Sequence, residues 1–154
     1  MNETPHAQLL ATLNARRGVE TPPTVTEVDR SMIRRFCVAT GNLHPLYLDE
    51  AYARGTRFGG IIAPPTFVAA FIAGHFPEII VRGLPFAREL HAQDEVRIAR
   101  PIRTGDVITA FARYDHASLQ VAARGPRLYQ AADLILRDAA QCEVAHVRIV
   151  TVAF

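Results

Sequence analysis

The chain has 154 residues, of which 49% are hydrophobic and 21% are charged, and its formal net charge is +2. This length and composition fit one globular domain and exclude collagen-like, low-complexity and disordered classes. The weak charge favours neither a nucleic acid nor a membrane surface as a partner. All 17 basic residues are arginine, which excludes Schiff-base chemistry and a P-loop lysine.

Features that bear on cellular location are few. The N-terminus is acidic and lacks the apolar core of a signal peptide. No apolar run approaches the ~18–20 residues that a membrane span needs. Cys37 and Cys142 lie far apart in apolar surroundings, so we expect two buried free thiols. Together these features predict a cytoplasmic protein.

The N-terminal half contains predicted helices around an irregular segment. We interpret residues 1–18 as a helical extension that precedes one domain at 19–154. A brief strand is predicted at 25–28. Residues 29–41 form a helix that starts at an acidic or hydroxyl cap and ends at a glycine. A short helical turn is predicted at 49–55.

The next helix and the C-terminal half predict the fold. Residues 66–74 are apolar all round, so we expect a helix that is buried on every side. Alternating apolar residues and turn signals predict four strands in the second half, at 95–100, 107–114, 128–137 and 144–154. The expected fold class is α+β, with one curled antiparallel sheet wrapped around one long buried helix.

Polar groups gather in the irregular segment at 41–65, between two apolar helices. By residue type, His44 can act as an acid or base, Tyr47 can donate a proton, and Asn42 can orient a group. Each has an equally ordinary structural role as a surface histidine, a packing tyrosine or a turn former. The six histidines show no pair at metal-ligand spacing, so no metal site is expected.

Two long motifs resemble the MaoC-like hydratases and dehydratases, and more narrowly the branch called the FAS1-like dehydratase domain. They run from Phe36 to Ala53, including Thr40-Gly41-Asn42-Leu43-His44-Pro45-Leu46-Tyr47, and from Phe58 to Phe67. Leu90-His91 and the pattern Arg100-Pro101-x-x-x-Gly105-Asp106 extend the match. The resemblance implies a single hot-dog fold. It also implies acyl-CoA or acyl carrier protein (ACP) thioesters as ligands, reversible hydration of a trans-enoyl group, and no cofactor.

The same resemblance shows where the chain departs from active members, whose loop reads Gly-Asp-x-Asn-Pro-x-His. Asn42 stands at the Asp position and Tyr47 at the His position. An amide is no general base, and a tyrosine with a pKa of about 10 stays protonated at neutral pH. Pro65 stands where the family places the glycine N–H of an oxyanion hole, and proline has no N–H. Residues that the resemblance assigns to substrate binding are Ala63, Pro64, Pro65, Thr66, Phe67 and His91.

Four functions remain open at this point. The chain resembles the non-catalytic half of the family's two-part enzymes, which favours one half of a dimeric hydro-lyase that works with a catalytic partner chain. A self-sufficient homodimer that uses His44 and Tyr47 is a second hypothesis. A hot-dog thioesterase with Asp49 or Glu50 as base is a third. A non-catalytic acyl-binding subunit is the fourth. All four predict a homodimer or a heterodimer with another hot-dog chain.

Overall fold

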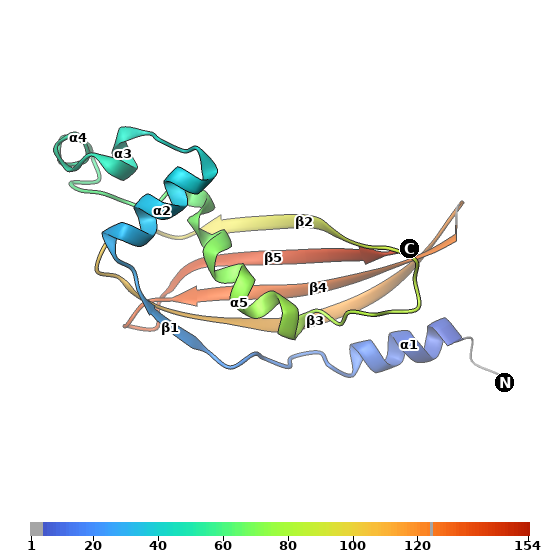
Figure 1. Cartoon of the computed structure of the whole chain (residues 1–154). Helices are drawn as coiled ribbons and strands as arrows, with labels where there is room; N and C mark the ends of the chain where they lie inside the picture. Colours follow the sequence, from blue (N-terminus) through green and yellow to red (C-terminus); the bar gives the residue numbers. More distant parts are fainter. Residues whose placement is uncertain (1–4, 124) are drawn as a thin grey trace.

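The structure is a computed structural model that describes residues 5–123 and 125–154; residues 1–4 of the predicted extension lie outside them (Figure 1). The elements in chain order are α1 (Pro5–Asn14), β1 (Thr24–Glu27), α2 (Arg30–Thr40), α3 (Pro45–Leu48), α4 (Glu50–Arg54), the 3₁₀ helix η1 (Pro65–Val68), α5 (Ala69–Ile79), β2 (Glu89–Ile98), β3 (Val107–Ala122), β4 (Gly125–Arg137) and β5 (Glu143–Ala153).

One antiparallel sheet has the strand order β1-β3-β4-β5-β2, and α5 lies across one of its faces (Figure 1). The side chains that the central strands turn toward this helix, such as Tyr114, Leu134 and Val147, are fully buried. Successive side chains of a strand point to opposite faces of the sheet, so apolar residues at every second position give these strands one apolar face. The α+β fold class and the hot-dog arrangement are confirmed.

Helix α5 is less enclosed than its sequence predicts. Only one face is buried, through Phe71, His75 and Ile79. The opposite face is exposed: it carries the small residues Ala69, Ala70, Ala73 and Gly74, followed by Pro77 and Glu78. The expectation of burial on every side was therefore wrong, because the sheet covers a single face of the helix and nothing in the described part of the chain covers the other.

The strands are longer than predicted, and one is displaced. β2 begins six residues before its predicted start at 95, and it is exposed along nearly its whole length. It pairs only with β5, so it forms a free edge of the sheet. β3 continues to Ala122 through a register shift between Tyr114 and His116. Such a bulge reverses the alternation of side chains, which hides the strand's second half from a simple period-2 search.

The two cysteines lie in different environments. Cys37 is fully buried in the main core, and this burial raises the pKa of its thiol. Cys142 is exposed in the β4–β5 turn. The expectation of two buried thiols was therefore wrong for Cys142, because the apolar strand residues that follow it in sequence point inward while the turn itself does not.

Helix α1 packs on a second, smaller core at the far end of the sheet (Figure 1). Leu13 is buried there against Leu84 and Leu128. The Asn14 side chain exchanges two hydrogen bonds with the backbone of Ala117, at 3.1 and 2.8 Å, which fixes the end of α1 to β3. None of the helices in the described ranges is long and apolar enough to cross a membrane.

Candidate functional site

The loop that carries the family-like motif is held by local capping interactions. Asp29 accepts a hydrogen bond from the N–H of Met32 (2.8 Å) and caps the start of α2. Gly41 ends α2 in the left-handed region, at φ 69°, a conformation that glycine adopts without strain. The N–H of Asn42 then donates to the carbonyl of Cys37, so the chain reverses into α3.

His44 has a structural role in this loop. Its Nδ1 accepts a hydrogen bond from the N–H of Leu46 (3.1 Å), which caps α3. The neutral ring therefore carries its proton on Nε2. The ring lies 5.7 Å from the ring of Tyr47 and 5.9 Å from that of Tyr52, and its side chain is exposed. His44 does not line the cavity beside Pro65 that is described next.

A cavity of about 320 Å³ lies beside this loop, at the start of η1 and the end of β2; we call it the Tyr47 cavity. Its lining is mostly apolar. The residues are Leu46, Tyr47, Arg57, Phe58, Ile62, Ala63, Pro64, Pro65, Val68, Ile98, Ala99, Arg100, Pro101 and Ile102. Among these described residues the polar side chains are one phenol and two guanidinium groups, with no carboxylate and no imidazole.

Hydrogen bonds between distant segments build the cavity wall. The guanidinium of Arg103 donates to the carbonyl of Phe58 (2.6 Å), and the N–H of Ala63 donates to the carbonyl of Ile102 (2.8 Å). These bonds hold the segment before η1 against the β2–β3 connection. The cavity wall therefore depends on two pieces of chain that are about forty residues apart in sequence.

Arg100 stiffens the same connection. Its Nη1 donates to Asp106 (2.7 Å) and its Nη2 lies 3.3 Å from Asp138. The hydrogen bond to Asp106 raises the pKa of Arg100 above its ordinary value, and Asp138 adds to the effect. The motif Arg100-Pro101-x-x-x-Gly105-Asp106 thus forms an ion-paired turn that closes one side of the cavity.

Part of the predicted substrate-binding set comes together here with one catalytic candidate. Ala63, Pro64 and Pro65 line the Tyr47 cavity beside Tyr47 itself. Pro65 is the first residue of η1, and it provides no N–H at the cavity wall. Thr66 is exposed and is absent from the lining.

Other predicted residues lie apart from the cavity. Phe67 is 1% exposed and packs edge-on against Phe36 and Phe71, so it supports the wall from within the core. Asn42 is half-buried and is absent from the lining of the Tyr47 cavity.

His91 lies at the opposite end of α5. Its ring stacks on Phe76, with 5.6 Å between centroids, and its Nε2 lies 2.7 Å from the carboxylate of Asp94. It lines a separate cavity of about 230 Å³.

Residues 98–102 and Arg57 belong to the lining but were absent from the sequence-based set. The turn motif at Arg100-Pro101 was the available signal. It indicated a strand-turn-strand unit, but a sequence pattern does not tell which loop this turn contacts. Of the other apolar residues nearby, Phe71 packs inside the core, whereas Leu46 lines the cavity.

The carboxylates considered for thioesterase chemistry have local structural partners. Asp49 accepts hydrogen bonds from the N–H groups of Ala51 (2.8 Å) and Tyr52 (3.1 Å) and caps α4. Glu50 pairs with Arg54 at 3.2 Å. Neither carboxylate lines the Tyr47 cavity.

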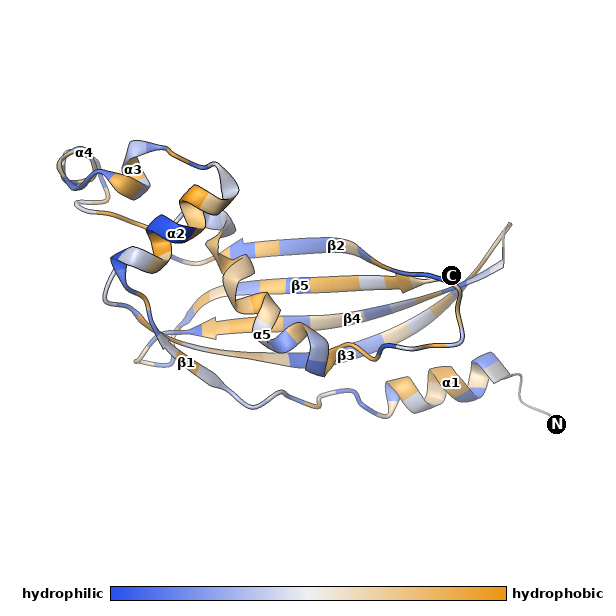
Figure 2. Ribbon diagram, in the orientation of Figure 1, coloured by the Kyte–Doolittle hydropathy of each residue, from blue (hydrophilic) through white to orange (hydrophobic). Residues whose placement is uncertain are grey.

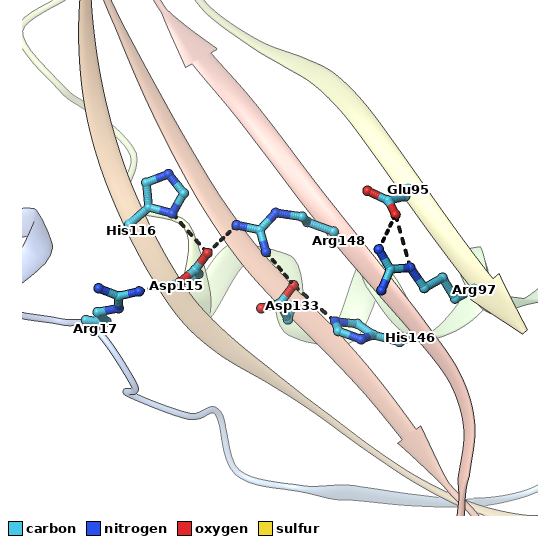
Figure 3. A network of polar contacts seen from close by, with 8 residues as sticks. All are labelled: Arg17, Glu95, Arg97, Asp115, His116, Asp133, His146 and Arg148. Atoms are coloured by element: carbon cyan, nitrogen blue, oxygen red, sulfur yellow. Dashed lines mark hydrogen bonds and ion pairs between the residues drawn. The ribbon is translucent and has the colours of Figure 1, made fainter. Parts of the chain in front are cut away.

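A cluster of eight polar side chains lies on the sheet face that points away from α5 (Figure 3). It comprises Arg17, Glu95, Arg97, Asp115, His116, Asp133, His146 and Arg148. Arg148 bridges two strands by contacting Asp115 and, at 3.4 Å, Asp133. The hydrogen bond to Asp115 raises the pKa of Arg148. Three guanidinium groups thus face three carboxylates, so the cluster balances its own charge and ties the strands together.

In the part of the chain that the structure describes, no group of three or more His, Cys, Asp or Glu side chains is placed to hold a metal ion. The cluster in Figure 3 satisfies its charges with arginine instead.

Fold and cavity together define a hot-dog protein with an apolar, ligand-sized cavity beside the loop between α2 and α4. The chain belongs to the family described as the FAS1-like, dehydratase domain region, whose model matches residues 15–147. The family resemblance seen in the sequence is therefore confirmed.

Individual relatives agree with this assignment. A UPF0336 protein of Streptomyces griseus is 38% identical over 92 residues, which cover 57% of this chain and 61% of the relative. The match thus spans about three-fifths of that protein's length.

Two solved structures share the fold. One is the ChsH1–ChsH2 complex of Mycobacterium tuberculosis (TM-score 0.72, 18% identity, covering 96% of this chain and 94% of that chain). The other is a MaoC-like dehydratase (TM-score 0.73, 24% identity, 92% of this chain and 43% of that chain). In the second case our chain corresponds to less than half of a longer protein.

Proposed function

We propose that this chain is one half of a dimeric hydro-lyase that hydrates enoyl thioesters or dehydrates 3-hydroxyacyl thioesters. In this assignment it supplies part of the acyl-binding wall, and a partner hot-dog chain supplies the catalytic Asp and His. The observation that carries the proposal is the lining of the Tyr47 cavity: it is apolar and of ligand size, yet it contains no carboxylate and no imidazole. Such a cavity binds an acyl chain but has no group to activate water.

The free edge of the sheet supports a partner chain. β2 carries Leu90, Val96 and Ile98 with exposed side chains, and its outer backbone groups have no strand neighbour in the described chain. An exposed apolar edge strand is a site for pairing with another sheet. The small residues of α5 are exposed as well, and Figure 2 shows the first part of this helix in pale and orange colours, with blue toward its C-terminal end. A second copy would again carry Asn42 and Tyr47 in place of the Asp and His, so the proposed partner is a different hot-dog chain.

The decisive experiment compares the chain alone with the chain plus its partner. The partner is a hot-dog chain of the same host that bears the Gly-Asp-x-Asn-Pro-x-His loop and co-purifies with this one. With crotonyl-CoA we expect background hydration by the chain alone and full activity by the pair. Asp→Asn in the partner loop abolishes that activity. Tyr47→Phe leaves kcat of the pair within a few-fold, because the phenol lines the cavity without activating water.

Three other results would contradict this proposal. If the chain alone hydrates crotonyl-CoA, and His44→Ala or Tyr47→Phe abolishes the reaction, the chain is a self-sufficient homodimeric enzyme. Release of free thiol by the chain alone, lost in Asp49→Asn, would instead establish a thioesterase. Binding of the thioester without any turnover, with or without the partner, would leave only an acyl-binding subunit.

The cavity itself is tested by narrowing it. Leu46→Trp places a larger side chain in the lining, so it should raise KM for a decenoyl thioester much more than for a crotonyl thioester. Val121→Trp is the matched control, because Val121 is 90% exposed in the β3–β4 hairpin at the other end of the sheet. Equal effects of both substitutions, or an equal effect on both substrates, would contradict the assignment of the acyl site.

A further inference from the structure

The cavity that His91 lines is separate from the Tyr47 cavity, and we call it the His91 cavity. Its volume is about 230 Å³. It lies near the C-terminal end of α5, where β2 begins and β5 ends (Figure 1). The lining residues are Phe76, Ile80, Arg82, Glu89, Leu90, His91, Gln130, Thr151, Val152 and Ala153. The proposed reaction makes no use of this cavity.

Three polar side chains lie in one row across the sheet at this cavity. Gln130 of β4 and His91 of β2 both pair directly with Thr151 of β5, so the three side chains share one face of the sheet. This is the face that α5 covers, because His91 stacks on Phe76 and Gln130 hydrogen-bonds to Val81, just after the helix. Thr151 is 8% exposed and Gln130 is 3% exposed. Polar groups therefore line the buried side of the cavity.

Two hydrogen-bond donors in this row have no protein partner. Within residues 5–123 and 125–154, no hydrogen bond involves the hydroxyl of Thr151. The amide oxygen of Gln130 accepts from the N–H of Val81 and from the Tyr114 hydroxyl, and its amide nitrogen donates one N–H to the carbonyl of Val81 (2.8 Å). The second N–H of that nitrogen has no acceptor in the same ranges. Buried donors without a partner cost free energy, and a ligand oxygen that pairs with both would regain it.

The charges around the cavity favour an uncharged ligand. Arg82 lies over the ring of Phe76, with 5.2 Å from its guanidinium carbon to the ring centroid, and Glu89 lines the same cavity. His91 is paired with Asp94 at 2.7 Å. A carboxylate ligand would meet the repulsion of Glu89, and an ammonium ligand would meet that of Arg82. The other lining residues are apolar: Phe76, Ile80, Leu90, Val152 and Ala153.

We propose that the His91 cavity binds an uncharged group made of a small apolar body and one hydroxyl or keto oxygen. A cavity of about 150 Å³ is enough for benzene, so this one holds an apolar body of about six carbons together with the oxygen. The oxygen pairs with the Thr151 hydroxyl and the spare N–H of Gln130, and the hydrocarbon lies against Phe76 and Val152. Two sources present this chemistry: a free alcohol or ketone, and the oxygen-bearing end of a longer acyl chain. One chain supplies the whole lining, so the site is independent of the proposed function.

The test uses three probes that share a hexyl chain and differ in the head group: 1-hexanol, hexanoate and hexylammonium. Each is titrated into the full chain labelled with nitrogen-15, and the backbone amide signals of Thr151 and His91 report binding. We expect 1-hexanol to saturate these shifts with a Kd of the order of millimolar, as befits so small a ligand. Hexanoate and hexylammonium should bind at least about tenfold more weakly, because moving an unpaired charge out of water is costly.

Variants of Thr151 test the role of its hydroxyl. Thr151→Val removes the hydroxyl and nearly keeps the shape, so it should weaken 1-hexanol binding by about 3- to 10-fold, the net value of one hydrogen bond. Thr151→Ser keeps the hydroxyl and should keep the preference for the alcohol. Thr104→Val is the matched control, because Thr104 is exposed in the β2–β3 connection and is absent from the lining. It should bind all three probes as the wild type does.

The melting temperature separates a binding role of this hydroxyl from a structural one. Because the hydroxyl has no partner in the described chain, Thr151→Val should leave the melting temperature unchanged or raise it. A fall of several degrees, with the preference for 1-hexanol intact, would show that the hydroxyl serves the fold and would contradict the proposal. Shifts that do not saturate, or equal binding of the three probes by the wild type, would overturn it as well.

Competition identifies the source of the ligand. If 10-hydroxydecanoyl-CoA displaces 1-hexanol and decanoyl-CoA does not, the oxygen belongs to an acyl chain. If neither displaces it, the ligand is a free alcohol or ketone. Equal displacement by both thioesters would contradict the role of the oxygen. The binding of 1-hexanol does not require hydration of crotonyl-CoA, so failure of the proposed function would leave this site standing.

Discussion

Acidification should destabilise the fold through His75. This side chain is 3% exposed, and its two ring nitrogens lie 2.7 Å from the hydroxyl of Thr21 and 3.0 Å from that of Thr24. The Thr21 oxygen accepts from the N–H of Ala112 (2.9 Å), which leaves its own proton available for donation to Nδ1. Nε2 then carries the ring proton and donates to Thr24. Both nitrogens of the neutral ring thus have a hydrogen-bond partner, and neither partner is a carboxylate that would stabilise a second ring proton.

The direction of the pH effect follows from the pKa. Burial lowers the pKa of His75 in the folded chain, and the nearby Glu78 opposes this only in part. In the unfolded chain the pKa is about 6.5. Above that pH the ring is neutral in both states, and stability does not depend on it. Below it the unfolded state binds one more proton, so the free energy of unfolding falls by up to about 1.4 kcal/mol per pH unit, until the folded pKa is reached.

Urea denaturation between pH 7.5 and pH 5.0 checks this reasoning, at one fixed protein concentration because an oligomer's stability depends on it. His75→Gln is the reference, since glutamine is polar but does not titrate. At pH 7.5 the variant should be less stable by about 1 kcal/mol, the value of a buried hydrogen bond. The difference should shrink or reverse as pH falls, because only the wild type loses the His75 contribution. Parallel curves for the two proteins would refute the argument.

Three stability predictions concern other buried or capping groups. Gln130 bonds both backbone groups of Val81 (2.8 and 3.2 Å) and accepts from the Tyr114 hydroxyl (3.3 Å), so Gln130→Leu should cost about 2–4 kcal/mol in urea denaturation. Asp29→Ala should cost about 1 kcal/mol, whereas Asp29→Asn, which still caps α2, should cost less. Leu134 is fully buried, and Leu134→Ala should lower the unfolding free energy by about 2–5 kcal/mol. A loss below 1 kcal/mol there would contradict the assigned core.

The parts of the fold that depend on local chemistry were predictable from sequence. Asp29 and Gly41 bound α2, and Asp49 caps α4, as their residue types indicated. A cap needs only its own turn, so a short window of sequence contains the cause. The role of His44 is just as local. Histidine is an uncommon helix cap, however, so its residue type did not indicate the hydrogen bond from Leu46.

Features that depend on distant contacts were not predictable in the same way. The exposed face of α5 follows from how far the sheet reaches around the helix, which no helical pattern encodes. The second half of β3 lies beyond a bulge at Tyr114–His116 that reverses the alternation. The wall of the Tyr47 cavity needs Arg103 to reach the carbonyl of Phe58, a contact across 45 positions. The motifs indicated Tyr47 and residues 63–65 but not the distant segment at 98–102 that lines the same cavity.

The position of the Tyr47 cavity gives a physical reason for the chain to require a partner. Ile98 belongs both to the free edge strand β2 and to the cavity wall, and it is 39% exposed. Apolar ligands gain free energy from surface that is removed from water, so an open wall binds an acyl chain weakly. We infer that a chain paired along β2 would cover Ile98 and close this wall. Acyl binding would then strengthen pairing, and pairing would strengthen acyl binding by the same factor, because the two equilibria are linked. Under the proposed function, a chain without its own catalytic pair would thus have a reason to retain its cavity, because the cavity would couple ligand binding to assembly with the catalytic subunit.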